Sequence, residues 1–282
     1  MTDPASFSSA ACAASPYDEL FIYYLKGCLR PENEVFGEAF IGNWEEDGFS
    51  FLFFSRPASD AIRELLGRQP GLELVDSYQM PYADWQGARD IALQTERLQV
   101  FPPWQASPGG DRRGIVLDPG VVFGTGTHPT TRDCLRALEQ LYAREAPATV
   151  LDLGTGTGLL ALAAARLGAR RTLAIDLNPL CARTAARNVR LNGLAERVLV
   201  VRGRAEAFVG LPADVVVANI HFDVMQVLLR TEGFYRKRWF VLSGLLPSEA
   251  RRVLDLLAAK PVEIIEEWHH DGVWSTFYGR IG

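Results

Sequence analysis

Hydrophobic residues in the second half of the chain alternate between two patterns. Short apolar runs of strand length occur at residues 150–153, 172–175, 197–202, 214–219 and 239–243. Between or after them lie segments of helical length, at residues 159–167, 180–192, 224–229 and 247–259. Two last strands are expected on either side of a turn at Asp271 and Gly272, at residues 262–269 and 273–281. Alternating strands and helices are typical of an α/β fold with a mostly parallel sheet.

The first 80 residues show a different pattern. We expect a helix from Ser59 to about Arg68, capped by Ser59, and strands at residues 21–26, 35–44, 49–55 and 72–78. These elements predict a small α+β domain over residues 17–79, after an Ala/Ser-rich disordered tail over residues 1–16. Residues 80–113 are expected to be a linker that begins with a helix. The α/β domain is expected to span residues 114–282.

Three glycines follow the first strand of the α/β part directly. They are Gly154, Gly156 and Gly158, and the next strand ends at Asp176, 22 positions after the first of them. Glycines let a backbone turn tightly and approach a ligand closely. A carboxylate at the end of the second strand is suited to ribose hydroxyls. Since the carboxyl ends of parallel strands line one crevice, the pattern predicts a nucleoside site there.

The type of nucleoside is narrowed by two details of this segment. The glycines have the spacing Gly-x-Gly-x-Gly, which differs from the Gly-x-Gly-x-x-Gly pattern of dinucleotide enzymes. Asp152 precedes them and favours a ligand that carries positive charge. S-adenosylmethionine, with its sulfonium and amino groups, therefore fits better than a pyrophosphate cofactor.

Composition excludes several classes of protein. The chain has 282 residues, 48% of them hydrophobic and 22% charged, as expected for a globular protein with one large and one small domain. A net charge of −5 gives no support to a nucleic-acid surface. The four cysteines lack metal-ligand or redox spacing. Without a leader or an apolar run of transmembrane length, we expect a cytoplasmic protein that binds no membrane and no metal.

Three blocks of sequence are distinctive. The first is the run Phe-Gly-Thr-Gly-Thr-His-Pro-Thr-Thr at residues 123–131, preceded by Asp-Pro-Gly at residues 118–120. The second is the glycine turn with Asp176. The third is Asp-Val-Val-Val-Ala-Asn-Ile at residues 214–220, with Leu-Ser-Gly-Leu-Leu at residues 242–246. With these blocks the chain resembles the bacterial methyltransferases that modify protein eleven of the large ribosomal subunit, and the resemblance covers roughly residues 80–282.

The resemblance implies a fold and a set of site residues. The fold is a seven-stranded class I S-adenosylmethionine-dependent methyltransferase domain, Rossmann-like, with a small N-terminal α+β domain that docks the substrate. The cofactor contacts implied for this chain, with one further glycine of the turn, are Thr131, Gly154, Gly156, Asp176 and Asn219. Phe123 and His128 would line the methyl-transfer pocket together with Asn219, whose side-chain oxygen would orient the acceptor nitrogen.

The predicted function is therefore S-adenosylmethionine-dependent methylation of lysine or other amino groups of a protein, by resemblance a ribosomal protein. Two alternatives stay open at this point. Asn219 and Phe222 occupy the first and fourth positions of an Asn-Pro-Pro-aromatic pattern, which would suit a planar amide or base nitrogen. The chain could also be a non-catalytic nucleoside-binding module that serves as an interaction protein.

The N-terminal part departs from the family pattern. Residues 28–33 are short and contain Pro31, where the family has the first helix of a ferredoxin-like docking domain. We therefore expect an altered docking domain.

Overall fold

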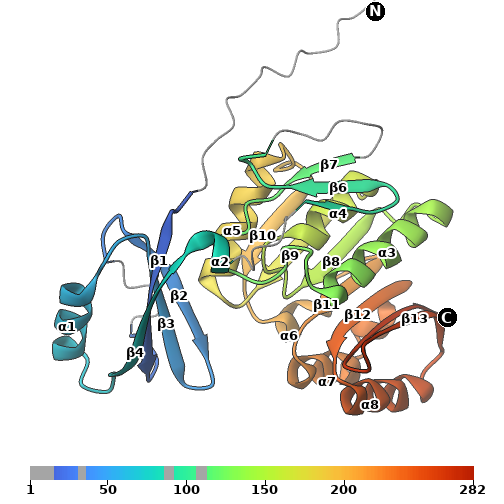
Figure 1. The fold of residues 1–282 in the computed structure, drawn as a ribbon. Helices are drawn as coiled ribbons and strands as arrows, with labels where there is room; N and C mark the ends of the chain where they lie inside the picture. Colours follow the sequence, from blue (N-terminus) through green and yellow to red (C-terminus); the bar gives the residue numbers. More distant parts are fainter. Residues whose placement is uncertain (1–15, 31–35, 86–91, 106–112) are drawn as a thin grey trace, which may run out of the picture.

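The structure is a computed structural model that describes residues 16–30, 36–85, 92–105 and 113–282 (Figure 1). The tail expected over residues 1–16 lies, apart from its last residue, outside this part. The described residues form one sheet of seven strands, one of four and one of three.

The seven-stranded sheet has the order β10-β9-β8-β11-β12-β14-β13. Its strands are β8 (Thr149–Leu153), β9 (Arg171–Asp176), β10 (Val198–Arg202), β11 (Val215–Asn219), β12 (Trp239–Leu245), β13 (Val262–His270) and β14 (Trp274–Ile281). The first five run parallel, and β14 pairs antiparallel with both β12 and β13. This arrangement confirms the predicted α/β class and the terminal hairpin.

Helices cover both faces of this sheet. They are α3 (Pro129–Arg144), α4 (Leu159–Leu167), α5 (Pro179–Leu191), α6 (Ala205–Phe208), α7 (Phe222–Arg230), a 3-10 turn (Phe234–Arg236) and α8 (Pro247–Ala258). Alternate residues of β11 enter different cores: Val217 packs with α3 and α4, whereas Val216 packs with α7 and α8. None of the helices in the described ranges is long and apolar enough to span a membrane.

The N-terminal sheet has the order β2-β3-β1-β4 and carries a single helix. Its strands are β1 (Glu19–Lys26), β2 (Phe40–Glu46), β3 (Phe49–Phe54) and β4 (Glu73–Pro81), and the helix is α1 (Ser59–Arg68). The connection between β1 and β2 contains no helix among its described residues, in line with the expected departure from the family pattern. Leu29 from this connection is fully buried beside Leu25 and Leu65, on the face that α1 covers.

Two predictions about local structure in this region are wrong. Ser59 is the first residue of α1 and not its cap; Ala58 holds the cap position, and the Ser59 hydroxyl lies 3.2 Å from that of Tyr23. The expected linker helix is only α2 (Tyr82–Trp85) in the described part.

The three-stranded sheet follows α2 in the chain. Its strands are β5 (Leu93–Gln94), β6 (Leu98–Phe101) and β7 (Arg113–Val116). Apolar residues of this sheet join the core of α3 and α4.

The second face of the N-terminal sheet packs against the α/β part. Leu20 and Ile22 of β1 share a buried cluster with Val121 and Leu180. The backbone of β2 comes so close to α5 that a Cβ on Gly42 would lie 2.6 Å from Cδ1 of Leu180. A glycine is therefore needed at this point of β2 for the two parts to pack as they do.

We predict that Gly42→Leu loosens this contact, because its side chain has no space beside Leu180. Overpacking of this kind costs about 1–3 kcal/mol. Amide hydrogen exchange should become faster in β2 and at the start of α5 and stay unchanged in β8 and β11. Gly67→Ala is the control, since a Cβ on Gly67 meets no atom within 4 Å. Unchanged exchange in the Gly42 variant would contradict the packing argument.

Candidate functional site

The glycine turn after β8 forms the floor of the site. Gly154 and Gly156 have positive φ angles of 75° and 56°. A Cβ on Gly154 would lie 2.0 Å from Cγ2 of Ile220, and one on Gly156 would lie 2.4 Å from the carbonyl oxygen of Phe123. Conformation and space both require glycine, because Ile220 and the Phe123 carbonyl pack directly against the turn.

Asp176 at the end of β9 reaches the same turn. Its Oδ2 accepts a hydrogen bond from the backbone N–H of Gly156 at 2.9 Å, and its Oδ1 accepts one from that of Asn178 at 2.9 Å. Burial raises the pKa of the carboxyl, and these two hydrogen bonds oppose that effect. The Cys181 thiol and the Leu177 backbone also hydrogen-bond to this carboxyl. The structure thus brings Gly156 and Asp176 together, as predicted.

Asp152 lies beneath the turn with one oxygen unpartnered. Its Oδ2 accepts hydrogen bonds from the Thr155 hydroxyl at 2.5 Å and from the Ala161 N–H at 3.1 Å. Its Oδ1 is buried and has no hydrogen-bond partner among the described residues. Burial raises the pKa of Asp152 to about 7. A cation near this carboxyl would offset the cost of its burial.

The loop before α3 lies over the glycine turn and is fixed there by α5. Thr157 donates its N–H to the Phe123 carbonyl at 3.1 Å and its hydroxyl to the Gly124 carbonyl at 2.6 Å. Asn188 of α5 is fully buried and donates from Nδ2 to the carbonyls of Asp118 and Thr157, both at 2.8 Å. Its Oδ1 accepts from the Asp118 N–H at 2.8 Å. A single amide therefore joins the loop, the turn and the helix.

Three aromatic rings meet at the outer end of this loop. The His128 ring makes edge contacts with Phe123, with centroids 5.3 Å apart, and with Trp274, with centroids 5.1 Å apart. Phe123 is 48% exposed, so its ring is accessible at the surface of the site. The rings provide a partly apolar surface next to the end of β11.

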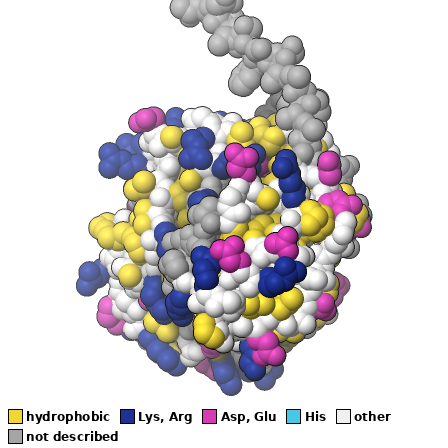
Figure 2. Space-filling model, turned by 90° about the vertical axis from the view of Figure 1, so that its left-hand side faces the viewer, with side chains coloured by type: hydrophobic (Ala, Val, Ile, Leu, Met, Phe, Trp, Pro, Cys, Tyr) yellow, Lys and Arg dark blue, Asp and Glu magenta, His cyan; other side chains and the backbone are white. Residues whose placement is uncertain are grey.

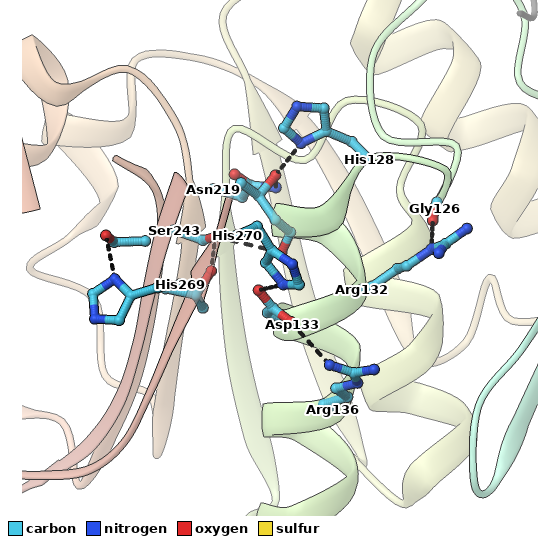
Figure 3. Close-up of polar contacts among 12 residues, drawn as sticks. Gly126, His128, Arg132, Asp133, Arg136, Asn219, Ser243, His269 and His270 are labelled. Atoms are coloured by element: carbon cyan, nitrogen blue, oxygen red, sulfur yellow. Dashed lines mark hydrogen bonds and ion pairs between the residues drawn. The ribbon is translucent and has the colours of Figure 1, made fainter. Parts of the chain in front are cut away.

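A chain of hydrogen bonds connects this aromatic group to Asn219 (Figure 3). Nδ2 of Asn219 donates to Oγ1 of Thr130 at 3.2 Å, and Oγ1 lies 2.7 Å from Nδ1 of His128. The hydroxyl oxygen has two lone pairs, so it can accept from the amide and still donate to or accept from Nδ1, according to the tautomer of His128. Burial lowers the pKa of His128, and the charge of nearby His270 lowers it further. The lowered pKa favours the neutral ring at pH 7.

The remaining predicted residue is Thr131. It lies in the first turn of α3, and its hydroxyl is buried without a hydrogen-bond partner in the described part of the chain. With Asp152 Oδ1, this gives two buried polar atoms without partners near the carboxyl edge of the sheet. Such atoms fit a cofactor with amino, hydroxyl and sulfonium groups.

Sequence analysis missed Thr130 and Trp274 as site residues. Thr130 lies inside the block at residues 123–131 but had no role assigned. Trp274 is the first residue of β14, which runs antiparallel to β12 from the edge where Leu245 pairs with Ser275. The sequence predicted a strand that begins near residue 273. Because this strand is antiparallel to β12, its first residues lie at the edge of the sheet where the ligand crevice is expected.

Comparison with known proteins identifies the family. The family model for ribosomal protein L11 methyltransferase (PrmA) matches residues 82–281. The chain belongs to the ribosomal protein L11 methyltransferase family. A relative of that name from Gloeobacter violaceus is 39% identical over 214 residues, covering 72% of this chain and 65% of the relative. One from Heliobacterium modesticaldum is 38% identical over 209 residues, covering 70% and 64%. The chain thus matches slightly less than two thirds of their length.

A solved structure of the family has the same fold. The ribosomal protein L11 methylase from Lactobacillus delbrueckii subsp. bulgaricus is 28% identical, with a TM-score of 0.58. The match covers 67% of this chain and 96% of that structure. The class I methyltransferase fold expected for the α/β part is therefore confirmed.

We predict that Asp176→Ala weakens binding of S-adenosylmethionine by about 1.5–3 kcal/mol, the scale for hydrogen bonds to a charged group. Titration calorimetry measures the affinity, and circular dichroism checks that the variant is folded. Equal affinity of a folded variant and the wild type would contradict a ribose contact at Asp176.

A second prediction concerns pH and the buried Asp152. Its pKa is about 7 in the folded protein and about 3.9 in the unfolded chain. Between these values the folded state holds a proton that the unfolded state lacks, so Asp152 makes the free energy of unfolding decrease as pH rises. Asp152→Asn removes this contribution, and its stability relative to wild type should increase by about 1.4 kcal/mol per unit from pH 5 to pH 7. Denaturant unfolding of both proteins at pH 5, 6, 7 and 8 measures the difference; parallel curves would refute the prediction.

Proposed function

We propose that this chain is an S-adenosylmethionine-dependent protein methyltransferase that modifies amino groups of a ribosomal protein, as the names of its L11 methyltransferase relatives indicate. The observation that carries the proposal is that several candidate site residues lie together at one edge of the sheet. The glycine turn, Asp176 and the chain from Asn219 to His128 all lie there, within the residues that match the family. Its location in the cytoplasm stays a prediction.

The residues of this edge divide into two groups. Asp176 and the backbone of Gly154 and Gly156 would hold the nucleoside, and Asp152 and Thr131 would meet the polar groups of the methionine part. When bound, S-adenosylmethionine supplies a methyl carbon that is activated by its positively charged sulfur. The chain's own contribution is to hold the acceptor nitrogen in line with that carbon and to exclude water.

Asn219 is suited to orient the acceptor because its amide has a fixed direction. Thr130 accepts from its Nδ2, so Oδ1 is turned to the other side. Gly244 leaves room there: a Cβ at this glycine would lie 2.9 Å from Oδ1. An oxygen held in this way accepts a hydrogen bond from an amine and directs the nitrogen lone pair away from itself. The neighbouring rings of Phe123 and Trp274 favour the uncharged amine, because they displace water.

The planar-nitrogen alternative has no structural observation in its favour. It depended on Phe222 as an aromatic wall for a flat acceptor. Phe222 is the first residue of α7 and is buried in the core of α7 and α8 with Met225. Its ring is thus part of the core that supports β11.

We propose further that residues 17–79 act as a docking unit for the protein substrate. The turn between β2 and β3 supports this, because Oε1 of Glu46 lies 3.7 Å from Nε2 of His221, two positions after Asn219. The unit therefore extends to the rim of the candidate site. On its side of the molecule, Figure 2 shows side chains of both charge signs interspersed with hydrophobic ones. Leu74, Val75 and Tyr78 of β4 are among the exposed apolar residues.

The experiment that tests the proposal is single-turnover methylation of purified ribosomal protein L11. We predict that wild-type protein transfers labelled methyl from S-adenosylmethionine, and that Asn219→Ala slows transfer by about a hundredfold, the scale for loss of one positioning hydrogen bond in an active site. Cofactor affinity should change much less. Asp223→Asn, an exposed change in the first turn of α7, is the control. Normal single-turnover rates in folded Asn219→Ala would refute the positioning role, and absence of transfer by wild type would refute the proposed acceptor.

A further inference from the structure

A pair of a carboxylate and an imidazole borders the candidate site, between α3 and the end of β13. Nε2 of His270 lies 2.7 Å from Oδ2 of Asp133 (Figure 3). The Asp133 side chain is 1% exposed, whereas the His270 side chain is 33% exposed. Both atoms are themselves buried, and their contact is an ion pair by distance, without a well-aligned hydrogen bond to each other or to another described residue. At 2.7 Å an unprotonated ring nitrogen and a carboxylate oxygen would repel, so the ring hydrogen lies on Nε2.

The charge of Asp133 is balanced without a proton from His270. NH1 of Arg136, one turn further along α3, lies 3.4 Å from Oδ1 of Asp133. A guanidinium is always protonated in proteins. The buried carboxylate therefore has a permanent cation on one oxygen. His270 on the other oxygen is free to exist in the neutral or the protonated form.

His270 and the aromatic end of the site lie on the same side of the β13–β14 hairpin. His270 is paired directly with Trp274, and side chains of directly paired residues point to the same face. The Trp274 ring contacts that of His128. The charge of His270 also acts on His128, whose pKa it lowers. The imidazole of His270 thus lies beside the surface that we propose for the acceptor.

The imidazole of His128 is not suited to accept a proton from a substrate. Its Nδ1 already contacts the Thr130 hydroxyl at 2.7 Å, and burial and the charge of His270 both lower its pKa. His270 has the opposite arrangement. Its Nε2 hydrogen faces Asp133, which leaves Nδ1 as the nitrogen with a lone pair, and Nδ1 makes no hydrogen bond with a described residue.

We propose that His270, held by Asp133, is the base that accepts the proton which the acceptor ammonium group must lose before methyl transfer. The inference rests on the proposed function. In this step an N–H bond of the ammonium breaks, its electron pair stays on the amine nitrogen, and the proton binds Nδ1 of His270. The positive charge moves from the substrate to an imidazolium next to Asp133. Water later takes the proton from the ring.

The ionisable groups around His270 support this assignment. From α3 it is faced by Asp133 and, across that carboxylate, by Arg136. From the loop before α3 it is faced by His128, which is neutral. The opposite strand presents Trp274, which does not ionise. On its own strand, His269 is directed to Glu267 and Ser275 and does not share the pair. The nearest full charge is therefore the Asp133 carboxylate.

The test is a pH profile of single-turnover methylation of ribosomal protein L11 from pH 6 to pH 10. His270→Gln should reduce the rate about thirtyfold at pH 7, and the loss should shrink as pH approaches the lysine pKa of about 10.4, where the amine loses its proton without help. Asp133→Asn should act in the same direction. His269→Gln is the matched control and should retain the wild-type profile.

A second readout needs neither cofactor nor substrate. The ring nitrogen signals of His270 in an NMR spectrum should place the hydrogen of the neutral ring on Nε2 in wild type, and Asp133→Ala should let the other tautomer appear, because the variant lacks the carboxylate that faces Nε2. An equal loss of rate at all pH values in His270→Gln, or no loss, would overturn the assignment while the proposed function stands. Wild-type protein that fails to methylate L11 would overturn the proposed function, and the inference with it.

Discussion

The candidate site depends on one buried amide. Asn188 uses both nitrogen hydrogens and its oxygen to join the Asp118 backbone to the Thr157 carbonyl. Without it, buried carbonyls and an N–H would lack partners, at a cost of about 1–3 kcal/mol for each group. The contact also determines where the loop before α3 lies, and hence where Phe123 and His128 point. The positions of Phe123 and His128 thus depend on α5, a helix that carries neither of them.

Sequence patterns were sufficient for the central sheet. The strands β8, β9, β11 and β12 are continuous apolar runs because helices bury both of their faces, and such runs are recognisable without neighbours. The three-stranded sheet of β5, β6 and β7 was missed, since its strands have two to four residues and the first lies beside a segment expected to be helical. Ser59 was assigned as a cap because serine favours that position. Tertiary packing against Tyr23 instead placed it one residue inside the helix.

The site shows the same division between local and non-local information. The closeness of Gly156 and Asp176 follows from the strand–turn–helix–strand order, so it was predictable. The approach of His270 to Asp133 does not follow from the local order of elements. These residues are 137 positions apart and meet only through the register of β13 on β14 and the packing of α3 on the sheet. In sequence, His269 and His270 are indistinguishable neighbours. Successive side chains of a strand point to opposite faces, so His269 lies toward Ser275 and His270 toward α3.

The hydroxyl of Thr130 has a consequence for the proposed acceptor pocket. A hydroxyl has a single hydrogen, so with Nδ1 of His128 unprotonated it cannot donate both to the imidazole and to an Asn219 whose oxygen is turned toward it; one of the two acceptors would then lack a hydrogen. Under the proposed function, the polarity of the acceptor pocket would therefore depend on a residue that forms none of its walls. A nitrogen that offers a hydrogen would find a partner in Asn219 Oδ1 only while the Thr130 hydroxyl keeps the amide in its present orientation. A threonine in the first turn of a helix would in this way affect a reaction that it does not touch.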